Sequence, residues 1–567
     1  MKLVGAEVLV ECLLEQNVDI IFGYPGGAVL PIYDALYKYE ADNKITHIIT
    51  AHEQGATHAA DGYARATGKV GVVIATSGPG ATNTVTGIAT AYLDSVPLVV
   101  FTGQVSRALL GKDSFQEVNF TDITGSITKK NYIVTEASKF PEIIREAFRI
   151  ARSGRPGPVV IDIPKDIQTS MIEYEKAVID SSLNPTASSK LIAYNKEVEL
   201  NYDMIADAIN KSERPVIYAG GGVNISGAQD ELLKFAEKVK SPVACSLMGL
   251  GCFPGNHPYY MGMVGMHGTR CSNYAMSKCD LMIAIGARFS DRVVSDFGSF
   301  AVNAKVIHID IDPSEFGKNV DAQIPICGDV NGILKRLNQI VDNRQENNWN
   351  EQIKQWKQEY PLKYVNNGSL SPQFVMQKLY DISNGNCIIT TEVGQNQIWA
   401  AQFYTFTKPR TFISSGGLGT MGYGLGAAIG ASFGKTGYKV INVAGDGSFK
   451  MNSIELATIS KYKIPLVQLI FNNHCLGMVR QWQDLFYGSR FSHTTLTDDV
   501  DFVKLANAYN IHAVRITDNS QVEQVLSKAL SLNEPILIEC MIDHDDKVFP
   551  IVPPGEPINN IIDFLEN

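Results

Sequence analysis

Short runs of Val and Ile alternate along this chain with longer stretches rich in Ala and Leu. Apolar runs of about four to eight residues are typical of strands buried on both faces, and the longer stretches fit helices that cover them. The alternation predicts an α/β fold built from doubly wound parallel sheets. The predicted strands are Ile45–Thr50, Val70–Thr76, Leu98–Thr102, Val159–Ile163, Pro215–Ala219, Leu281–Gly286, Val306–Ile311, Lys439–Ala444, Leu466–Phe471 and Pro535–Met541.

Two polar stretches interrupt this rhythm and divide the 567 residues into three blocks. A loop rich in Ser and Gly opens a small-residue helix in the first block, at Ser77–Gly80, and in the third, at Ser414–Gly417. This similarity predicts two related doubly wound modules that flank a third. We expect an N-terminal domain at 1–168, a linker at 169–197, a central domain at 198–341, a linker at 342–371, a third domain at 372–545 and a tail at 546–567.

Composition excludes several classes of protein. The net charge of -10 is spread along the chain, and Lys129–Lys130 is the nearest approach to a basic cluster in the first block, so we expect neither nucleic acid nor a membrane as a partner. No apolar stretch approaches the roughly 20 residues of a membrane span. The nine cysteines form no Cys-x-x-Cys pair, which predicts reduced, mostly buried thiols.

The first helix argues against a targeting segment. Glu7, Glu11 and Glu15 line one face of an amphipathic helix, whereas signal peptides are apolar and transit peptides are rich in Arg and poor in acidic residues. We therefore expect a cytoplasmic protein.

Two motifs in the third block point to a metal site. Gly445-Asp446-Gly447 follows one predicted strand and Asn472-Asn473 follows another. The carboxyl ends of strands in an open parallel sheet form the edge where ligands bind. A carboxylate, an amide oxygen and a backbone carbonyl fit the octahedral oxygen shell of Mg²⁺, which commonly bridges phosphates. Either motif alone is more often a structural turn, but together they favour the site.

This pair of motifs resembles the metal and diphosphate site of thiamine diphosphate (ThDP) enzymes. The resemblance implies that Asp446, Asn473 and the carbonyl oxygen of Cys475 bind Mg²⁺. It also implies that Glu53, within Ala51–Ala56, hydrogen-bonds the aminopyrimidine of ThDP, a role that suits a carboxyl group whose pKa is raised towards neutrality by apolar surroundings. The alternative is that Glu53 only favours a helix N-terminus through the helix dipole. In these enzymes the glutamate and the metal belong to different subunits, which implies an obligate dimer.

A glycine-rich segment fits the same cofactor. Gly416–Gly424 has too many glycines to begin as a helix, and it can let the backbone approach a ligand closely. Met421 matches the bulky residue that holds ThDP in a bent shape, although a Met is otherwise more often a core residue. The resemblance implies that ThDP is bound by Gly27, Glu53, Gly394, Gln395, Gly419, Met421, Gly445, Asp446, Gly447, Ser448, Asn473, Cys475, Leu476, Gly477 and Met478.

Longer motifs limit the resemblance to a smaller group of ThDP enzymes. These motifs are Phe22–Gly27, Ser77–Asn83, Phe115–Glu117, Gly154–Pro158, Gly262–Gly268 and Gly477–Gln483. Over nearly the whole chain they are similar to the catalytic subunits of the biosynthetic, FAD-containing acetohydroxyacid synthases. Such enzymes decarboxylate pyruvate on ThDP and condense the hydroxyethyl unit with pyruvate or 2-ketobutyrate, giving 2-acetolactate or 2-aceto-2-hydroxybutyrate for branched-chain amino acid biosynthesis. The family also implies a homodimer or tetramer and a small regulatory subunit.

The same resemblance assigns substrate contacts. Gln116 would contact the reacting oxygens, and the channel would be lined by Phe115, Lys165, Arg292, Met478 and Trp482. Trp482 would favour the larger acceptor by packing on its extra methyl group, an effect of about 1–3 kcal/mol per methylene. The ordinary alternatives are a core Trp and a solvated Lys.

The middle block carries glycine-rich or acidic segments after three predicted strands, at Gly220–Gly222, Gly286–Arg288 and Asp310–Asp312. Glycines permit close approach to a dinucleotide, and a carboxylate can bind ribose hydroxyls. No G-x-G-x-x-G is present, so tight turns remain an alternative. The resemblance implies a non-redox FAD bound by Arg155, Gly220, Gly221, Gly222, Met266, His267, Gly268, Gly286, Arg288, Asp310, Ile311, Asp329 and Val330.

Two positions depart from the family pattern. Ser290 stands where the family has Asp, beside the channel residue Arg292, and Gly426 replaces a Pro, which we expect to affect only helix rigidity. Two other functions stay open. A pyruvate oxidase or another 2-keto acid decarboxylase or carboligase would share the cofactors, and Trp482 argues against a pyruvate oxidase. A catalytically inactive scaffold would not need Glu53 and Asp446.

Overall fold

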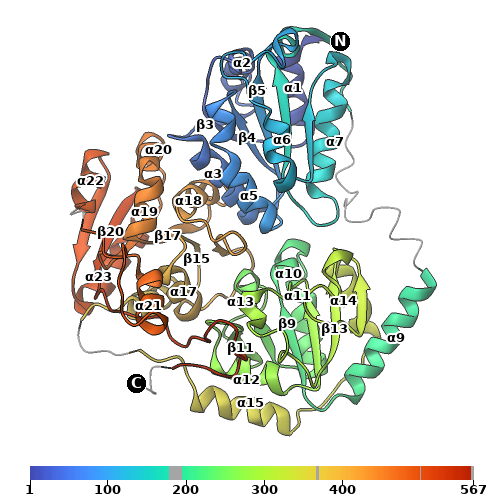
Figure 1. Ribbon diagram of the computed structural model, residues 1–567, viewed down its shortest axis with the longest axis vertical. Helices are drawn as coiled ribbons and strands as arrows, with labels where there is room; N and C mark the ends of the chain where they lie inside the picture. Colours follow the sequence, from blue (N-terminus) through green and yellow to red (C-terminus); the bar gives the residue numbers. More distant parts are fainter. Residues whose placement is uncertain (178–194, 365–368, 498–499, 564–567) are drawn as a thin grey trace.

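The computed structural model describes residues 1–177, 195–364, 369–497 and 500–563. It contains three six-stranded sheets in which every pair of neighbouring strands is parallel (Figure 1). Helices pack on both faces of each sheet, so that hydrophobic clusters lie above and below it. The prediction of three parallel-sheet α/β domains is therefore confirmed.

The first and third sheets share one topology. The N-terminal sheet has the order β3-β2-β4-β5-β7-β6 and the C-terminal sheet the order β16-β15-β17-β18-β20-β19. Numbered from the first strand of each sheet, both read 2-1-3-4-6-5, as expected of two related modules. The strands are β2 (Ile20–Gly23), β3 (Thr46–Ile49), β4 (Gly71–Ala75), β5 (Leu98–Gln104), β6 (Lys130–Ile133), β7 (Val159–Pro164), β15 (Cys387–Thr391), β16 (Phe412–Ile413), β17 (Lys439–Gly445), β18 (Val467–Asn472), β19 (His512–Ile516) and β20 (Ile536–Met541).

The central sheet has a different order, β11-β10-β9-β12-β13-β14, which reads 3-2-1-4-5-6. This is the order of dinucleotide-binding sheets, in which the ligand lies at the switch point between the first and fourth strands. Here the switch point lies between β9 and β12. The strands are β9 (Pro215–Ala219), β10 (Val243–Cys245), β11 (Tyr260–Met263), β12 (Leu281–Ile285), β13 (Lys305–Asp310) and β14 (Ile324–Cys327).

The helices that cover the N-terminal sheet are α1 (Gly5–Glu15), α2 (Leu30–Ala41), α3 (Glu53–Thr67), α4 (Pro79–Thr82), α5 (Val85–Leu93), α6 (Phe120–Thr124), α7 (Phe140–Arg152) and α8 (Lys165–Thr169). Those of the central part are α9 (Asn195–Lys211), α10 (Gly221–Ser226), α11 (Gln229–Val239), α12 (Arg270–Lys278), α13 (Asp291–Val294), α14 (Val330–Ile340) and α15 (Asn348–Glu359). The C-terminal domain contributes α16 (Pro372–Ser383), α17 (Gln395–Phe403), α18 (Gly424–Gly434), α19 (Asp446–Asn452), α20 (Leu456–Tyr462), α21 (Gly477–Phe486), α22 (Phe502–Ala508) and α23 (Val522–Ser531).

All ten predicted strands are present within a few residues of their expected bounds. Most strands that the apolar pattern missed lie at sheet edges, namely β6, β11, β14, β16 and β19. An edge strand is paired on one side only and is less buried, so its sequence need not be a continuous apolar run.

The N-terminal and C-terminal domains share a core where α3 packs against α18 (Figure 1). Glycines make this contact close: a Cβ on Gly62 would lie 2.1 Å from the carbonyl oxygen of Ala427, and one on Gly430 would lie 1.7 Å from that of Ala59. Gly426 belongs to the same contact, because its Cβ would lie 2.7 Å from the Cβ of His58. The expectation that Gly426 affects only helix rigidity was therefore wrong.

The segments expected to be linkers carry structure. The short antiparallel pair β1 (Lys2–Val4) and β8 (Met171–Glu173) joins residues past 168 to the N-terminal domain, while residues 178–194 lie outside the described part. In the second segment, α15 buries Trp349, Ile353 and Trp356 against the central domain. These three apolar residues recur at the spacing of a helix face, which is a signal for an amphipathic helix. The polar composition of the whole stretch suggested a linker instead.

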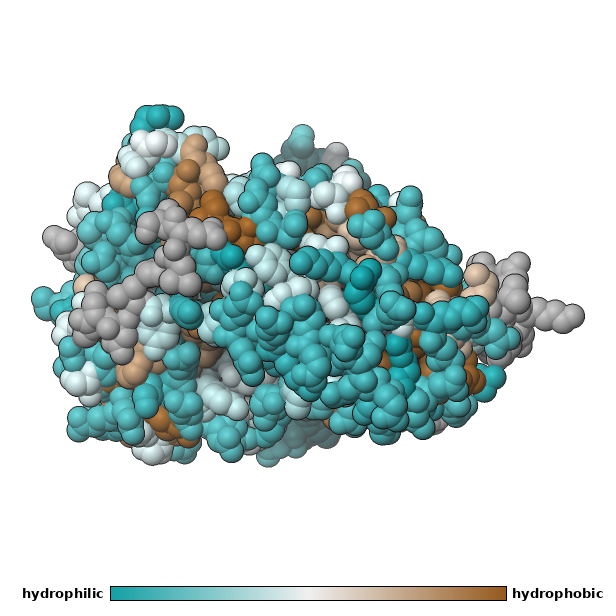
Figure 2. All heavy atoms as spheres, turned by 90° about the horizontal axis from the view of Figure 1, so that it is seen from below, coloured by the Kyte–Doolittle hydropathy of each residue, from teal (hydrophilic) through white to brown (hydrophobic). Residues whose placement is uncertain are grey.

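The surface and the thiols agree with the composition. All nine cysteines are free, and all except Cys327 are buried. Figure 2 shows a face on which hydrophilic residues predominate and apolar residues form separate patches. Within the described part of the chain, no helix combines the length and the apolar character that a bilayer crossing requires.

Candidate active site

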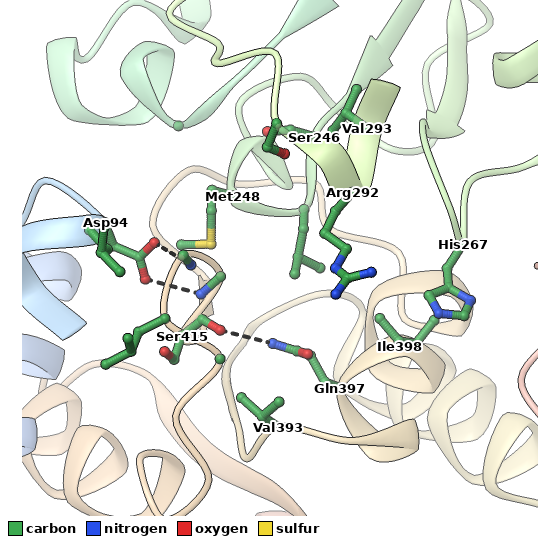
Figure 3. A pocket seen from close by; sticks show the side chains of 18 of the residues that line it. Asp94, Ser246, Met248, His267, Arg292, Val293, Val393, Gln397, Ile398 and Ser415 are labelled. Atoms are coloured by element: carbon green, nitrogen blue, oxygen red, sulfur yellow. Dashed lines mark hydrogen bonds between the residues drawn. The ribbon is translucent and has the colours of Figure 1, made fainter. Parts of the chain in front are cut away.

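All three domains line a cavity of about 880 Å³ (Figure 3). This volume is at the upper end of the range for small-molecule sites. The C-terminal domain supplies the ends of β15, β17 and β18, and the central domain supplies the ends of β9, β12 and β13. The cavity therefore lies where both sheets present the carboxyl ends of their strands, the edge at which open α/β sheets bind ligands.

Asp446 and Asn473 come together at this edge. In the register of β17 and β18, Gly445 is paired with Phe471, so Asp446 begins α19 close to the point where Asn473 leaves β18. The Asp446 side chain is buried, and its Oδ1 has no hydrogen-bond partner among the described residues. Burial raises the pKa of Asp446 to about 6. A buried carboxylate oxygen without a partner fits a divalent cation, which would compensate its charge.

The two asparagines of the motif differ in their contacts. Asn472 donates to Oε1 of the buried Glu539 at 2.8 Å, and its own Oδ1 accepts from the amide of His474 at 3.1 Å. Asn473 instead lines the cavity, with longer contacts to the amide of Cys475 at 3.3 Å and to Gln395 at 3.4 Å. Only the second asparagine is free to face a ligand, because the first holds β18 against β20.

Most of the residues expected to bind ThDP line the cavity. Those that do so are Gly394, Gln395, Gly419, Met421, Gly445, Asp446, Gly447, Ser448, Asn473, Cys475, Leu476, Gly477 and Met478. Gly27 and Glu53 do not line it.

Glu392 supports the glycine-rich segment; the sequence placed it in the strand-end segment Thr391–Gln395, expected on the diphosphate side, but assigned it no role of its own. Its fully buried carboxylate accepts from the amides of Gly422 at 2.7 Å and Leu425 at 3.2 Å, just before and within the start of α18. Burial raises the pKa of Glu392 to about 7, although these amides favour the charged form. The neighbouring motif residues Gly394 and Gln395 gave no signal for this role.

Glu392→Gln should remove a pH dependence of stability. The native carboxyl titrates at about 7 and the unperturbed group at 4.5, so the native state binds the proton more tightly. The stability that this proton confers is complete below pH 4.5 and is lost as the pH rises to about 7. Relative to wild type, the variant should therefore gain up to about 3 kcal/mol between these pH values. Unfolding midpoints measured at pH 5 and pH 8 test this expectation, and an equal wild-type-to-variant difference at both would contradict it.

The glycines of the central domain have a structural explanation. The amide of Gly222 donates to the carbonyl of Gly286 at 2.9 Å, and that of Gly220 to the carbonyl of Ile285 at 3.0 Å. A Cβ on Gly220 would lie 2.3 Å from the Gly286 oxygen. The two strand-end turns thus touch through their backbones, as the alternative of tight turns implied. Gly221, Gly222 and Gly286 nevertheless line the cavity.

Other residues expected to bind FAD meet the same cavity, and these are Arg155, Met266, His267, Arg288, Asp310, Ile311, Asp329 and Val330. Gly220 and Gly268 do not line it. Asp329 caps α14 by accepting from Gly332 at 3.1 Å and also accepts from Ser226 at 2.9 Å. Asp310 ends β13 and accepts from the amide of Asp312 at 2.9 Å, so it keeps more capacity to bind a ligand.

Three of the predicted substrate residues also line the cavity, and these are Arg292, Met478 and Trp482. The guanidinium of Arg292 lies 5.8 Å from the centre of the Trp482 ring, and its Nη1 approaches Sδ of Met266 at 3.7 Å. The indole Nε1 of Trp482 is buried and has no partner among the described residues. Ser290, the departure from the family pattern, also lines the cavity beside Arg292.

The remaining predicted site residues lie in the N-terminal domain, away from this cavity. Glu53 and Gln116 both meet the loop Ser77–Gly80: a Cβ on Gly80 would lie 3.2 Å from Oε1 of Glu53, and one on Gly78 would lie 2.9 Å from the Cβ of Gln116. Oε2 of Glu53 accepts from Nδ2 of Asn83 at 2.9 Å. The structure therefore separates the predicted site within one chain into two groups of residues.

Gly27, Phe115 and Lys165 belong to the same domain. No described atom lies within 4 Å of a Cβ placed on Gly27, the Phe115 residue is 89% exposed, and Lys165 is exposed at the end of β7. Gln116 has a φ of 58°, in the left-handed region that non-glycine residues rarely adopt. Residues with a strained backbone cluster at functional sites.

Several lining residues carried no recognised sequence signal. Figure 3 shows Asp94, Ser246, Met248, Gln397 and Ile398 around the cavity. Gln397 lies two residues after the predicted Gln395 and could have been found from that motif. The others belong to segments whose patterns indicate only a helix end or a strand end.

Comparisons with known proteins identify the family of this chain. Three family profiles match the chain: "Thiamine pyrophosphate enzyme, N-terminal TPP binding domain" at residues 3–123, the central domain at 202–337 and the C-terminal TPP binding domain at 392–540. Thiamine pyrophosphate is another name for ThDP.

Full-length relatives narrow the family further. The chain is 49% identical to the "Probable acetolactate synthase large subunit" of Methanocaldococcus jannaschii, over 98% of this chain and 95% of that protein. It is 44% identical to the acetolactate synthase isozyme 2 large subunit of Escherichia coli, over 99% and 100% of the two chains. It is also 44% identical to the chloroplastic acetolactate synthase 1 of Oryza sativa, over 98% and 87%. The chain belongs to the acetolactate synthase large subunits, a family of thiamine diphosphate enzymes.

Proposed function

We propose that this chain decarboxylates pyruvate and condenses the two-carbon unit with pyruvate or 2-ketobutyrate, using ThDP held through Mg²⁺. The observation that carries the proposal is the buried Oδ1 of Asp446, which has no partner among the described residues and belongs to a cavity also lined by Asn473 and Trp482. A cation site and an aromatic wall within one cavity suit a phosphate-bearing cofactor next to a small organic acid.

The residues have distinct roles in this proposal. When bound, ThDP would supply an electron sink for decarboxylation. Asp446, Asn473 and the carbonyl of Cys475 would hold Mg²⁺, and Met421, which lines the same cavity, would contact the cofactor. Arg292, beside Trp482, offers a positive charge to the substrate carboxylate. Glu53 of a second copy would hold and release the proton that activation of ThDP requires.

We also assign a bound FAD to the central domain. The 3-2-1-4-5-6 strand order supports it, because the cavity opens at the switch point between β9 and β12. Asp310, at the end of β13, fits a ribose hydroxyl, and Arg155, whose guanidinium pairs with Asp312 and Glu315, lines the same cavity. This FAD has a structural role and takes no part in redox chemistry.

A second copy of the chain completes the proposed site. Within one protomer, Glu53 and Gln116 lie outside the cavity that contains Asp446. A homodimer or a tetramer in which the N-terminal domain of one copy covers the cavity of the other brings these groups together, as an isologous dimer permits. The relatives are named large subunits, which supports a small regulatory subunit as a further partner.

A pyruvate assay tests the function. The purified protein, stripped of cofactors, should form acetolactate only when ThDP and Mg²⁺ are both restored, and FAD should stay oxidised during turnover. Oxygen consumption that matches pyruvate consumption would instead indicate an oxidase. Absence of any ThDP-dependent product would favour the non-catalytic scaffold.

Trp482→Leu should lower the preference for 2-ketobutyrate over pyruvate as the acceptor by about tenfold, because one methylene in an apolar pocket is worth about 1–3 kcal/mol. Acetolactate formation should continue. The ratio of the two products in competition assays measures the effect. Tyr487→Leu is the matched control, since this aromatic residue is 56% exposed and lies one residue past α21. An unchanged product ratio in the Trp482 variant would remove this residue from the account of specificity.

A further inference from the structure

We infer that Asp94 of the N-terminal domain is a positioning residue that holds the glycine-rich loop Ser414–Tyr423 of the same chain in the conformation that receives the diphosphate cofactor. The inference rests on the proposed function for the identity of that cofactor. The contacts that hold the loop do not depend on it.

The Asp94 carboxylate accepts hydrogen bonds from two backbone amides of the loop. Its Oδ2 accepts from the amide of Gly416 at 3.0 Å and its Oδ1 from that of Gly417 at 2.7 Å (Figure 3). The Asp94 side chain is fully buried, although the two glycines are exposed towards the cavity. A Cβ on Gly417 would lie 2.9 Å from Oδ1 of Asp94, so a glycine is required for this close approach.

A buried arginine holds Asp94 in place. Arg65 of α3 donates to Oδ2 of Asp94 at 3.0 Å and to Oδ1 of Asp61 at 2.6 Å. Its charge is thus compensated by two carboxylates in a site from which water is excluded, and breaking such a network is costly. The same guanidinium donates to the carbonyl of Ser414 at 2.9 Å, so one side chain connects Asp94 to the start of the loop.

The far end of the loop is attached to the helices α3 and α5 of the N-terminal domain. The hydroxyl of Tyr423 donates to Oδ1 of Asp61, and the hydroxyls of Thr90 and Thr420 lie 2.7 Å apart. Gly419, with a φ of 70°, and Met421 lie between the contacts of Gly417 and those of Tyr423, and both line the cavity. The N-terminal domain therefore holds both ends of a loop whose middle lines the cavity.

This arrangement lowers the entropic cost of binding. Glycines have more conformational freedom in an unrestrained segment than other residues, and Gly416, Gly417 and Gly419 would have to be ordered when the cofactor binds. Hydrogen bonds to the charged Asp94 carboxylate order the loop beforehand, and preorganisation of this kind increases affinity.

Asp94→Asn tests the inference in the full-length protein. An amide can accept from one of the two glycines but presents its own N–H to the other and loses the charge that pairs with Arg65. We expect the Gly416 and Gly417 amides to exchange with deuterium about tenfold faster in the cofactor-free protein, and the Kd for ThDP in the presence of Mg²⁺ to rise about tenfold. The KM for pyruvate at saturating ThDP should change less than about twofold, because the Asp94 carboxylate hydrogen-bonds Arg65 and the loop rather than the predicted substrate residues.

Asp19→Asn is the matched control. Asp19 also accepts from a side chain of α3, the Tyr63 hydroxyl at 2.5 Å, and pairs with Lys69, but it makes no contact with the loop. Because the Asp19 side chain is 61% exposed, its variant should leave exchange at the loop and the Kd for ThDP unchanged. If Asp94→Asn does not fold, Gly417→Ala provides a second test, because the added methyl group pushes against the carboxylate and leaves every charge in place.

The two readouts separate this inference from the proposed function. Unchanged deuterium exchange at Gly416 and Gly417 in the Asp94 variant would overturn the inference. An equal loss of ThDP affinity in the Asp19 variant would also overturn it, because Asp19 does not contact the loop. A wild-type protein that binds no ThDP would instead overturn the proposed function, while faster exchange in the variant would still support the clamp on the loop.

Discussion

Glu53→Gln is expected to lower acetolactate formation about 100- to 10,000-fold, the usual contribution of a positioned acid or base. A carboxamide cannot hold and release the proton that Glu53 would exchange with bound ThDP. The substitution preserves shape, and its oxygen can still accept from Asn83, so the fold should be retained. Initial rates at saturating ThDP and Mg²⁺ measure the loss. Exchange of the ThDP C2 proton, followed by NMR, should slow in parallel.

Glu11→Gln serves as the control for this experiment. Glu11 also accepts one hydrogen bond, from the Tyr39 hydroxyl at 2.8 Å, and it lies in the same domain but away from the cavity. Its variant should keep full activity. Carboligation at the wild-type rate by the Glu53 variant would exclude the proton-transfer role and leave Glu53 as a residue that begins α3.

A mixed dimer of the Glu53→Gln and Asp446→Asn chains should regain about half of wild-type activity, although each homodimer is inactive. If each site takes its acid from one chain and its metal ligand from the other, one of the two sites in the mixed dimer is intact and the second lacks both groups. Co-expression with two affinity tags and sequential purification yields this species, and acetolactate formation measures its activity.

The outcome discriminates between two arrangements. Were Glu53 and Asp446 to serve the same site from one chain, each site of the mixed dimer would lack one group and activity would stay near that of the homodimers. The separation of Glu53 from the cavity within one protomer makes the first outcome the expected one. Mixed dimers of one wild-type chain and one variant chain provide the reference for dimer formation.

Local signals were sufficient for much of the fold and for part of the site. Continuous Val and Ile runs predicted most of the central strands, because a strand buried on both faces must be apolar along its length; the short β10 and the central β2 and β15 were missed. Asp446 and Asn473 were predicted to meet because each follows such a strand, and the two strands proved to be neighbours. The Ser–Gly loops predicted related modules, which share one strand order.

Patterns of hydrophobicity could not assign the roles of individual polar residues. Asn472 and Asn473 are adjacent and chemically identical, yet only the contact with Glu539 on another strand shows which of them is structural. Gly426 looked like a minor departure until its distance to α3 was known. The helix α15 was concealed by the polarity of its exposed residues.

The sequence by itself determined the α/β class, most of the buried strands and the residue types that suit a metal–diphosphate site, since these depend on periodicity and on the residues directly after each strand. Only the tertiary structure decided that Asp94 and Glu392 hold the glycine-rich loop and that Glu53 lies outside the cavity of its own chain. The physical reason is that a hydrogen bond between residues more than 300 positions apart, such as Asp94 and Gly417, depends on how domains pack and leaves no local pattern in the chain.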